Sequence, residues 1–148
     1  MEPMFIIIRI DKTREPFVKT AEAHYVRLLK TLRLPLEIRT LKGNNDAKKD
    51  TAMIVQKFYE EQNVYILSER GREYDSISFS RLIAPYKEQN RDIHFILSGP
   101  FGWSGDFPKN FKQLSLSKLT FTHEMSYIIL LEQLYRGIKI TKGQKYHY

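Results

Sequence analysis

Apolar and polar positions alternate in blocks along the chain, and the short apolar blocks predict β-strands. The first block, Met4–Ile10, is a nearly continuous β-branched run, which is the pattern of a strand covered on both faces. Comparable runs recur further along and are bounded by polar, turn-forming residues. The predicted strands are Met4–Ile10, Leu36–Leu41, Val64–Leu67, Ile93–Leu97 and Leu114–Leu116.

Between these runs, apolar residues recur every three or four positions, which predicts amphipathic helices. Proline suits the first turn of a helix, and aspartate is a good N-cap. The charged stretch Ser68–Asp75 has neither pattern and is expected to be a loop. The predicted helices are Pro16–Leu32, a helix carrying Ala52 to Tyr59 and capped by Asp46 or Asp50, a helix that begins at Ser76 or Ser78 and ends before Asn90, and His123–Ile140.

Strands that alternate with helices over the whole length predict one α/β domain, residues 1–148, with a mostly parallel sheet and helices on both faces. Ligands of such sheets bind beyond the carboxyl ends of the strands, so the loops after strands are the candidate site. Three loops qualify: Leu67–Gly71, Ser98–Gly105 and Ser117–Thr122. The middle loop holds three of the seven glycines, whose backbone can approach a ligand closely. A plain strand-to-helix connection is the alternative for each loop.

Composition narrows the chemistry. The chain has no cysteine, which excludes disulfides, thiol nucleophiles and cysteine zinc sites, and no apolar run long enough to cross a membrane. We therefore expect a cytoplasmic protein. Of the four histidines, His24 and His94 lie in a predicted helix and strand and are expected to pack, whereas His123 and His147 could reach a site. Their spacing predicts no metal site, and no nucleophile elbow, dinucleotide motif or phosphate loop occurs.

The net charge is compatible with a polyanionic partner, and the alternative is that the charge only keeps the protein soluble. The net charge is +7, and residues 76–148 contribute +5 of it, with 10 basic and 5 acidic side chains. The C-terminal stretch repeats a basic residue every third position, and aromatic residues flank it, as suits phosphates and unpaired bases of RNA. A solvated C-terminus is the alternative. The basic residues are Arg136, Lys139, Lys142 and Lys145, and the aromatic ones are Tyr135, Tyr146 and Tyr148.

Several segments of the second half together resemble the RlmH family of SPOUT methyltransferases. They are Phe95–Gly102 (FILSGPFG), Leu114–His123 (LSLSKLTFTH), Glu132–Arg136 (EQLYR) and Tyr146–His147. The resemblance implies an α/β knot with a deep C-terminal trefoil, a homodimer, and S-adenosylmethionine as the cofactor. It also implies methylation of N3 of a pseudouridine in 23S rRNA within the ribosome, the family target being pseudouridine 1915. No metal or membrane is implied as a partner.

The resemblance also assigns residues. Its cofactor contacts fall on Leu67, Gly99, Ser117, Lys118, Leu119, Thr120, Phe121 and Thr122. We predict that Tyr146, His147 and Arg136 position the acceptor base, and that His147 or solvent takes the proton. Three positions depart from the family: Ser98 replaces a glycine, Thr122 a common proline, and Tyr148 a basic residue.

Two other functions stay open at this point. One is a non-catalytic RNA-binding module of the same fold, which cofactor binding would distinguish. The other is a flavodoxin-like nucleotide or flavin binder, which leaves the basic, aromatic C-terminus unexplained.

Overall fold

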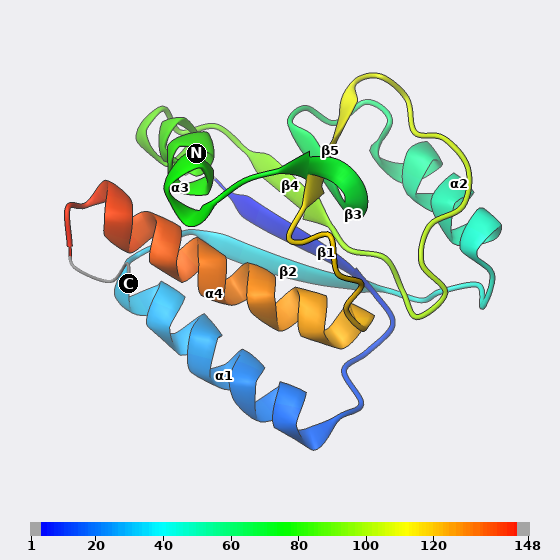
Figure 1. Ribbon diagram of the computed structural model, residues 1–148, viewed down its shortest axis with the longest axis horizontal. Helices are drawn as coiled ribbons and strands as arrows, with labels where there is room; N and C mark the ends of the chain where they lie inside the picture. The colour runs from blue at the N-terminus through cyan, green and yellow to red at the C-terminus, as the bar shows by residue number, and fades with distance from the viewer. Residues whose placement is uncertain (1–3, 145–148) are drawn as a thin grey trace.

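A computed structural model of the chain describes residues 4–144 and contains one five-stranded sheet (Figure 1). The strand order is β2-β1-β4-β3-β5, and every pair of neighbours is parallel. Parallel neighbours require crossover connections, which the helices supply. The strands are β1 (Phe5–Ile10), β2 (Leu36–Leu41), β3 (Val64–Glu73), β4 (Ile93–Ile96) and β5 (Phe111–Ser115).

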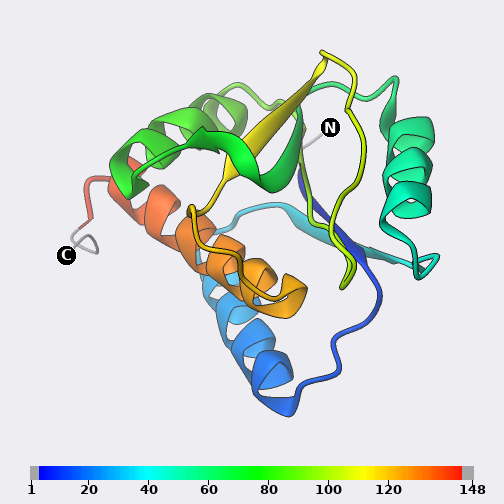
Figure 2. The same ribbon diagram turned by 45° about the vertical axis from the view of Figure 1, so that its right-hand side comes forward.

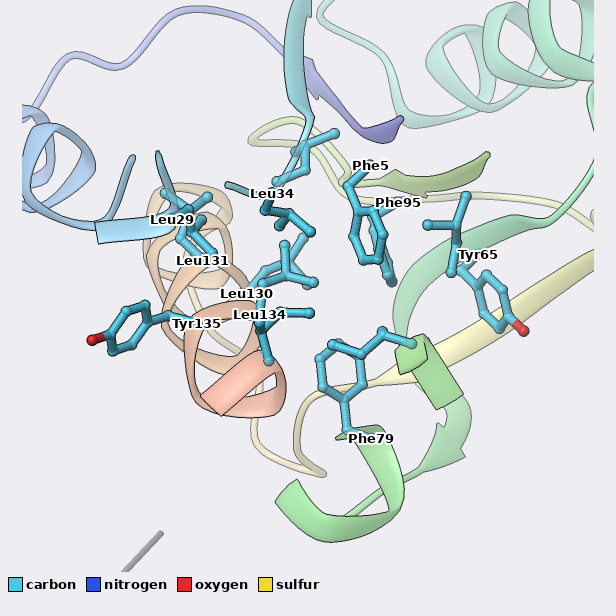
Figure 3. Packing of buried hydrophobic residues seen from close by; sticks show 14 of the residues in the cluster. Phe5, Leu29, Leu34, Tyr65, Phe79, Phe95, Leu130, Leu131, Leu134 and Tyr135 are labelled. Carbon is cyan, nitrogen blue, oxygen red and sulfur yellow. The ribbon is translucent and has the colours of Figure 1, made fainter. Parts of the chain in front are cut away.

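Helices cover both faces of the sheet, as predicted. One face carries the larger core cluster, to which α1, α3 and α4 contribute Leu29, Phe79 and Leu130 against Phe5 and Phe95 of the sheet (Figure 3). The other face packs against α2 through a smaller cluster, which Trp103 and Phe107 of the loop after β4 also join. The helices are α1 (Pro16–Thr31), α2 (Ala47–Phe58), α3 (Ser76–Glu88) and α4 (His123–Thr141).

Strand β1 lies inside the sheet, next to the edge strand β2, and all six of its residues are buried. It pairs with β2 on one side and β4 on the other, and both of its faces are covered by helices. This explains why its sequence is nearly continuous in apolar residues rather than alternating. The prediction of a buried first strand is confirmed.

Aspartate side chains fix where two helices, α2 and α3, begin. The carboxylate of Asp46 accepts hydrogen bonds from the backbone N–H groups of Lys48 and Lys49, so Asp46, not Asp50, caps α2. Asp75 caps α3 by accepting from the N–H of Ser78. Each cap satisfies helix donors that have no partner within the helix. The predicted starts of these helices are therefore explained by single residues.

The structure corrects one prediction. Residues 68–75 are not simply a charged loop, because β3 continues through Glu73. The sequence hides this continuation because the ladder with β5 shifts register: Leu67 and Arg72 both pair with Leu114, and the residues between them bulge. The bulge brings Gly71 so close to β5 that a Cβ there would lie 2.5 Å from the backbone of Gln113 and Leu114. Only glycine fits this crossing.

Candidate functional site

The three predicted segments meet at one cavity of about 990 Å³, which lies beside the bulge of β3 and beyond the carboxyl ends of β4 and β5. In Figure 2 the chain leaving β4, the turn after β5 and the start of α4 surround this edge of the sheet. Seven of the eight predicted cofactor residues line the cavity. They are Leu67, Gly99, Ser117, Leu119, Thr120, Phe121 and Thr122.

Lys118 is the exception among the eight. It is absent from the cavity lining, and its side chain is 85% exposed, with its Nζ 3.8 Å from a carboxylate oxygen of Glu73. An ion pair this exposed adds little stability. Lys118 therefore faces solvent while its neighbours in the turn line the cavity.

The glycine loop after β4 is held from both sides. The indole N–H of Trp103 donates to the backbone oxygen of Leu67 at 2.9 Å, which ties the loop to β3. The N–H of Ser104 donates to the hydroxyl of Thr51 on α2. Just before Trp103 the loop forms a turn, in which the backbone N–H of Gly102 donates to the backbone oxygen of Gly99. Gly102 has a φ of 73°, a backbone conformation that favours glycine. The loop is thus held to both β3 and α2.

Gly99 touches the core beneath the cavity. A Cβ at this position would lie 2.8 Å from the Cγ2 atom of Ile10, which is buried at the end of β1. The loop can approach the end of β1 this closely because residue 99 has no side chain. The depth of the cavity therefore depends on this glycine.

The turn before α4 is likewise held by hydrogen bonds. The hydroxyl of Ser117 accepts a hydrogen bond from the backbone N–H of Leu119. The backbone oxygen of Ser117 accepts a hydrogen bond from the hydroxyl of Ser115. Thr122 then caps α4, because its hydroxyl accepts a hydrogen bond from the backbone N–H of Met125. The φ of Thr122 is −61°. Proline has nearly the same φ, so threonine keeps the backbone conformation expected of the family and adds a cap.

A buried charged cluster supports the wall formed by α4. The guanidinium of Arg9, 4% exposed, lies 3.8 Å above the ring of Tyr127, and its Nη1 lies 3.8 Å from a carboxylate oxygen of Glu22. The Tyr127 hydroxyl donates to the same carboxylate, and burial and this bond raise the pKa of Tyr127 well above its usual value. The cluster therefore joins β1, α1 and α4.

His123 is the titratable ring in the cavity wall. Burial lowers its pKa below the usual 6.5, although Glu124 opposes the shift. The imidazole is therefore neutral at pH 7. Acidic side chains outnumber basic ones in the cavity lining, and this excess of negative charge favours a cationic ligand. The charged lining residues are Glu15, Glu69, Asp106, Glu124 and Arg70.

The lowered pKa of His123 predicts a pH dependence of stability. The unfolded chain takes up this proton first, so the free energy of unfolding falls as the pH drops below about 6.5 and levels off below the folded pKa. NMR titration of the His123 ring should give a pKa below 6.5, and in His123→Gln the fall in stability between pH 7 and pH 5 should be smaller. A measured pKa at or above 6.5 would contradict this.

Of the predicted acceptor residues, only Arg136 lies within the described residues, and the structure places it away from the cavity. Arg136 is absent from the lining and lies on α4 about 20 Å beyond His123, at about 1.5 Å per residue. Its Nε donates to the carboxylate of Glu132. Tyr146 and His147, like Tyr148, lie outside the described residues. Within residues 4–144, no cluster of potential metal ligands occurs and no helix is long and apolar enough to span a membrane.

The other two histidines lie away from the cavity lining. His94 is buried, and its Nδ1 lies 3.0 Å from the backbone oxygen of Gln62, as expected for a packed residue. His24 is exposed on α1, and its Nδ1 lies 3.3 Å from the Nη2 atom of Arg27 on the same helix. Sequence reasoning missed Trp103, although the single tryptophan of the chain stands inside the glycine loop and is a visible signal.

Comparisons with known proteins agree with this geometry. A family model described as "Predicted SPOUT methyltransferase" matches residues 4–147. The chain belongs to this family. Membership implies the predicted C-terminal knot, and the parallel sheet with helices on both faces confirms the predicted α/β class.

Individual relatives are similar over almost their whole length. A protein of Pseudothermotoga lettingae is 37% identical over 150 residues, covering 96% of this chain and 97% of the relative. One of Thermotoga maritima is 33% identical, covering 98% and 100%, and one of Flavobacterium psychrophilum is 31% identical, covering 96% and 97%. All three are named "Ribosomal RNA large subunit methyltransferase H".

Proposed function

We propose that this chain is an S-adenosylmethionine-dependent methyltransferase that methylates N3 of a pseudouridine in 23S rRNA, within ribosomes in the cytoplasm. The observation that carries the proposal is the single cavity into which three separate loops of a SPOUT-family chain converge. The names of the full-length relatives support the rRNA substrate. The resemblance of the glycine loop and of the turn before α4 supports the cofactor and the acceptor atom.

The residues present fit such a cofactor. The cavity lies in the size range of small-molecule sites, and the loop that lines it can lie against Ile10 because Gly99 has no Cβ to clash there. Buried Leu67 and Leu97 provide apolar wall for an adenine ring. The excess of carboxylates among the lining residues suits the positive charge of a sulfonium. The glycine loop and residues 117–122 would hold the cofactor.

The chain itself has two tasks in this reaction. When bound, S-adenosylmethionine supplies a methyl group already activated by its sulfonium. The preformed loops would bind and orient the cofactor without reorganisation, since their turns are closed by their own hydrogen bonds. Tyr146, His147 and Arg136 would orient the base, and His147 or solvent would accept the N3 proton.

A homodimer is part of this proposal, because Arg136 is remote from the cavity of its own subunit. Helix α4 buries one side against the sheet and α3, and leaves half-exposed apolar residues along another side. These are Ile128, Ile129 and Ile140, with the Glu132–Arg136 ion pair between them. A second copy packed on this side would bury them and bring its own C-terminus toward the cavity.

The function is tested by incubating the protein with labelled S-adenosylmethionine and ribosomes that lack the modification. We expect label in 23S rRNA, as N3-methylpseudouridine after digestion. His147→Ala should lower the methylation rate tenfold or more, because the base loses a positioning and proton-accepting group. Cofactor affinity, measured by titration calorimetry, should stay nearly unchanged.

The outcomes separate the alternatives. Cofactor binding without label in rRNA would contradict the proposal that 23S rRNA is the substrate. Neither cofactor binding nor label, with ribosome binding retained, would identify a non-catalytic RNA-binding module. Equal methylation rates for the wild type and His147→Ala would remove His147 from the mechanism.

A further inference from the structure

Large apolar side chains that remain exposed gather at the cavity mouth. Within residues 4–144 there are five of them, and four line the cavity. The four are Phe17, Phe101, Leu119 and Met125. Leaving such side chains in water forgoes the free energy of burial, so a cluster of them around one opening indicates a contact surface. The fifth, Tyr59, lies beyond the end of α2 and does not line the cavity.

Phe17 differs from the other three because a separate element carries it. It stands in the first turn of α1, which begins next to the start of α4, as both ribbon views show (Figures 1 and 2). Its ring is 59% exposed, whereas the next residue, Val18, is fully buried. The helix is therefore anchored by Val18 while Phe17 is presented to solvent at the mouth.

The chain that leads to Phe17 is held in place by buried groups. The guanidinium of Arg9 donates to the hydroxyl of Thr13 at 2.6 Å. The backbone N–H of Arg14 donates at 2.6 Å to the carboxylate of Glu124, which is 6% exposed. Glu124 belongs to the first turn of α4, directly after the turn that lines the cavity. Residues 12–19 are thus fixed relative to the predicted cofactor site.

Exposed basic residues stand close to Phe17 in the chain. Lys12, Arg14 and Lys19 are all exposed, and Glu15 is the one acidic residue between them. Aromatic rings stack on unpaired bases, and neighbouring cations contact the phosphates that follow each base. A hydrophobic protein partner would not need three cations at this position. Charge complementarity therefore favours RNA.

We propose that residues 12–19 form an RNA-contact element, in which Phe17 stacks on a base at the cavity mouth and Lys12, Arg14 and Lys19 contact phosphates. This inference rests on the proposed function and extends its substrate surface from the C-terminal half to the start of α1. Because Glu124 joins this element to α4, the stacked base is held in a fixed position relative to the methyl donor.

The test compares Phe17→Ala with Tyr59→Ala, a matched control that removes an equally exposed ring outside the cavity. Methylation is measured with unmodified ribosomes at several salt concentrations, and cofactor affinity by calorimetry. We expect Phe17→Ala to raise KM for ribosomes about tenfold, with cofactor affinity and kcat little changed. Phe17→Trp should restore KM, whereas Phe17→Leu should not. Tyr59→Ala should behave as wild type.

A separate experiment tests the phosphate contacts of the basic residues. In a variant with Lys12→Gln and Lys19→Gln, the dependence of KM on salt should weaken by about one unit of logarithmic slope for each lost phosphate contact. An unchanged KM in Phe17→Ala, or full rescue by leucine, would overturn stacking. A change in sedimentation mass in Phe17→Ala would assign the ring to a subunit contact instead. Wild-type protein that neither binds nor methylates ribosomes would contradict the proposed function itself.

Discussion

Gly71→Ala should destabilise the protein by about 3 kcal/mol, the upper range for overpacking a tight interior. The new methyl group would lie 2.5 Å from the backbone carbon of Gln113 and the backbone nitrogen of Leu114. No side-chain rotation can relieve contact with a backbone, so β3 and β5 must separate where their register shifts. In a chain of this size, the melting temperature should fall by about 6–12 °C.

The control is Gly137→Ala in α4. Its methyl group would also approach another atom, the Cδ1 of Ile83, at 2.8 Å. That atom is the end of a flexible side chain, and alanine favours a helix over glycine by about 1 kcal/mol. Gly137→Ala should therefore melt within a few degrees of wild type. Equal melting temperatures for Gly71→Ala and wild type would show that β3 and β5 do not cross as closely as described.

Gly99→Ala should weaken S-adenosylmethionine binding at least tenfold, or about 1.4 kcal/mol. Its Cβ would lie 2.8 Å from the Cγ2 of Ile10, and Ile10 is buried and paired in β1. The glycine loop is the less constrained partner, so the loop should shift into the cavity that it lines. Titration calorimetry measures the loss, and the methylation rate at low cofactor concentration should fall in parallel.

Gly43→Ala is the matched control for this change. A Cβ at Gly43 would meet the same Cγ2 atom of Ile10, also at 2.8 Å, but Gly43 does not line the cavity. Both variants should lose thermal stability, and only Gly99→Ala should lose cofactor affinity. Equal losses of affinity would mean that Ile10, rather than the glycine loop, controls the site. Unchanged affinity in Gly99→Ala would place the cofactor elsewhere.

Local sequence pattern was enough to predict most elements of this fold. Continuous apolar residues in Phe5–Ile10 reflect burial on both faces, and that requirement is visible in one short segment. The residues 68–73 were mispredicted because their strand character depends on β5, which lies about forty positions later in the chain. A bulged ladder has no local signature beyond Gly71, and a glycine alone indicates a turn as readily as a close crossing.

Likewise, some features of the candidate site could be predicted from the sequence and others could not. The fold class, the three segments after strands and, through resemblance, the family could be predicted from the sequence, because each of these depends on residues that lie close together in the chain. The tertiary structure alone decided that Lys118 faces solvent, that Arg136 is remote from the cavity, and that Phe17 stands at its mouth. These facts depend on how α1 and α4 pack side by side on the sheet, and packing joins residues about a hundred positions apart, such as Arg14 and Glu124.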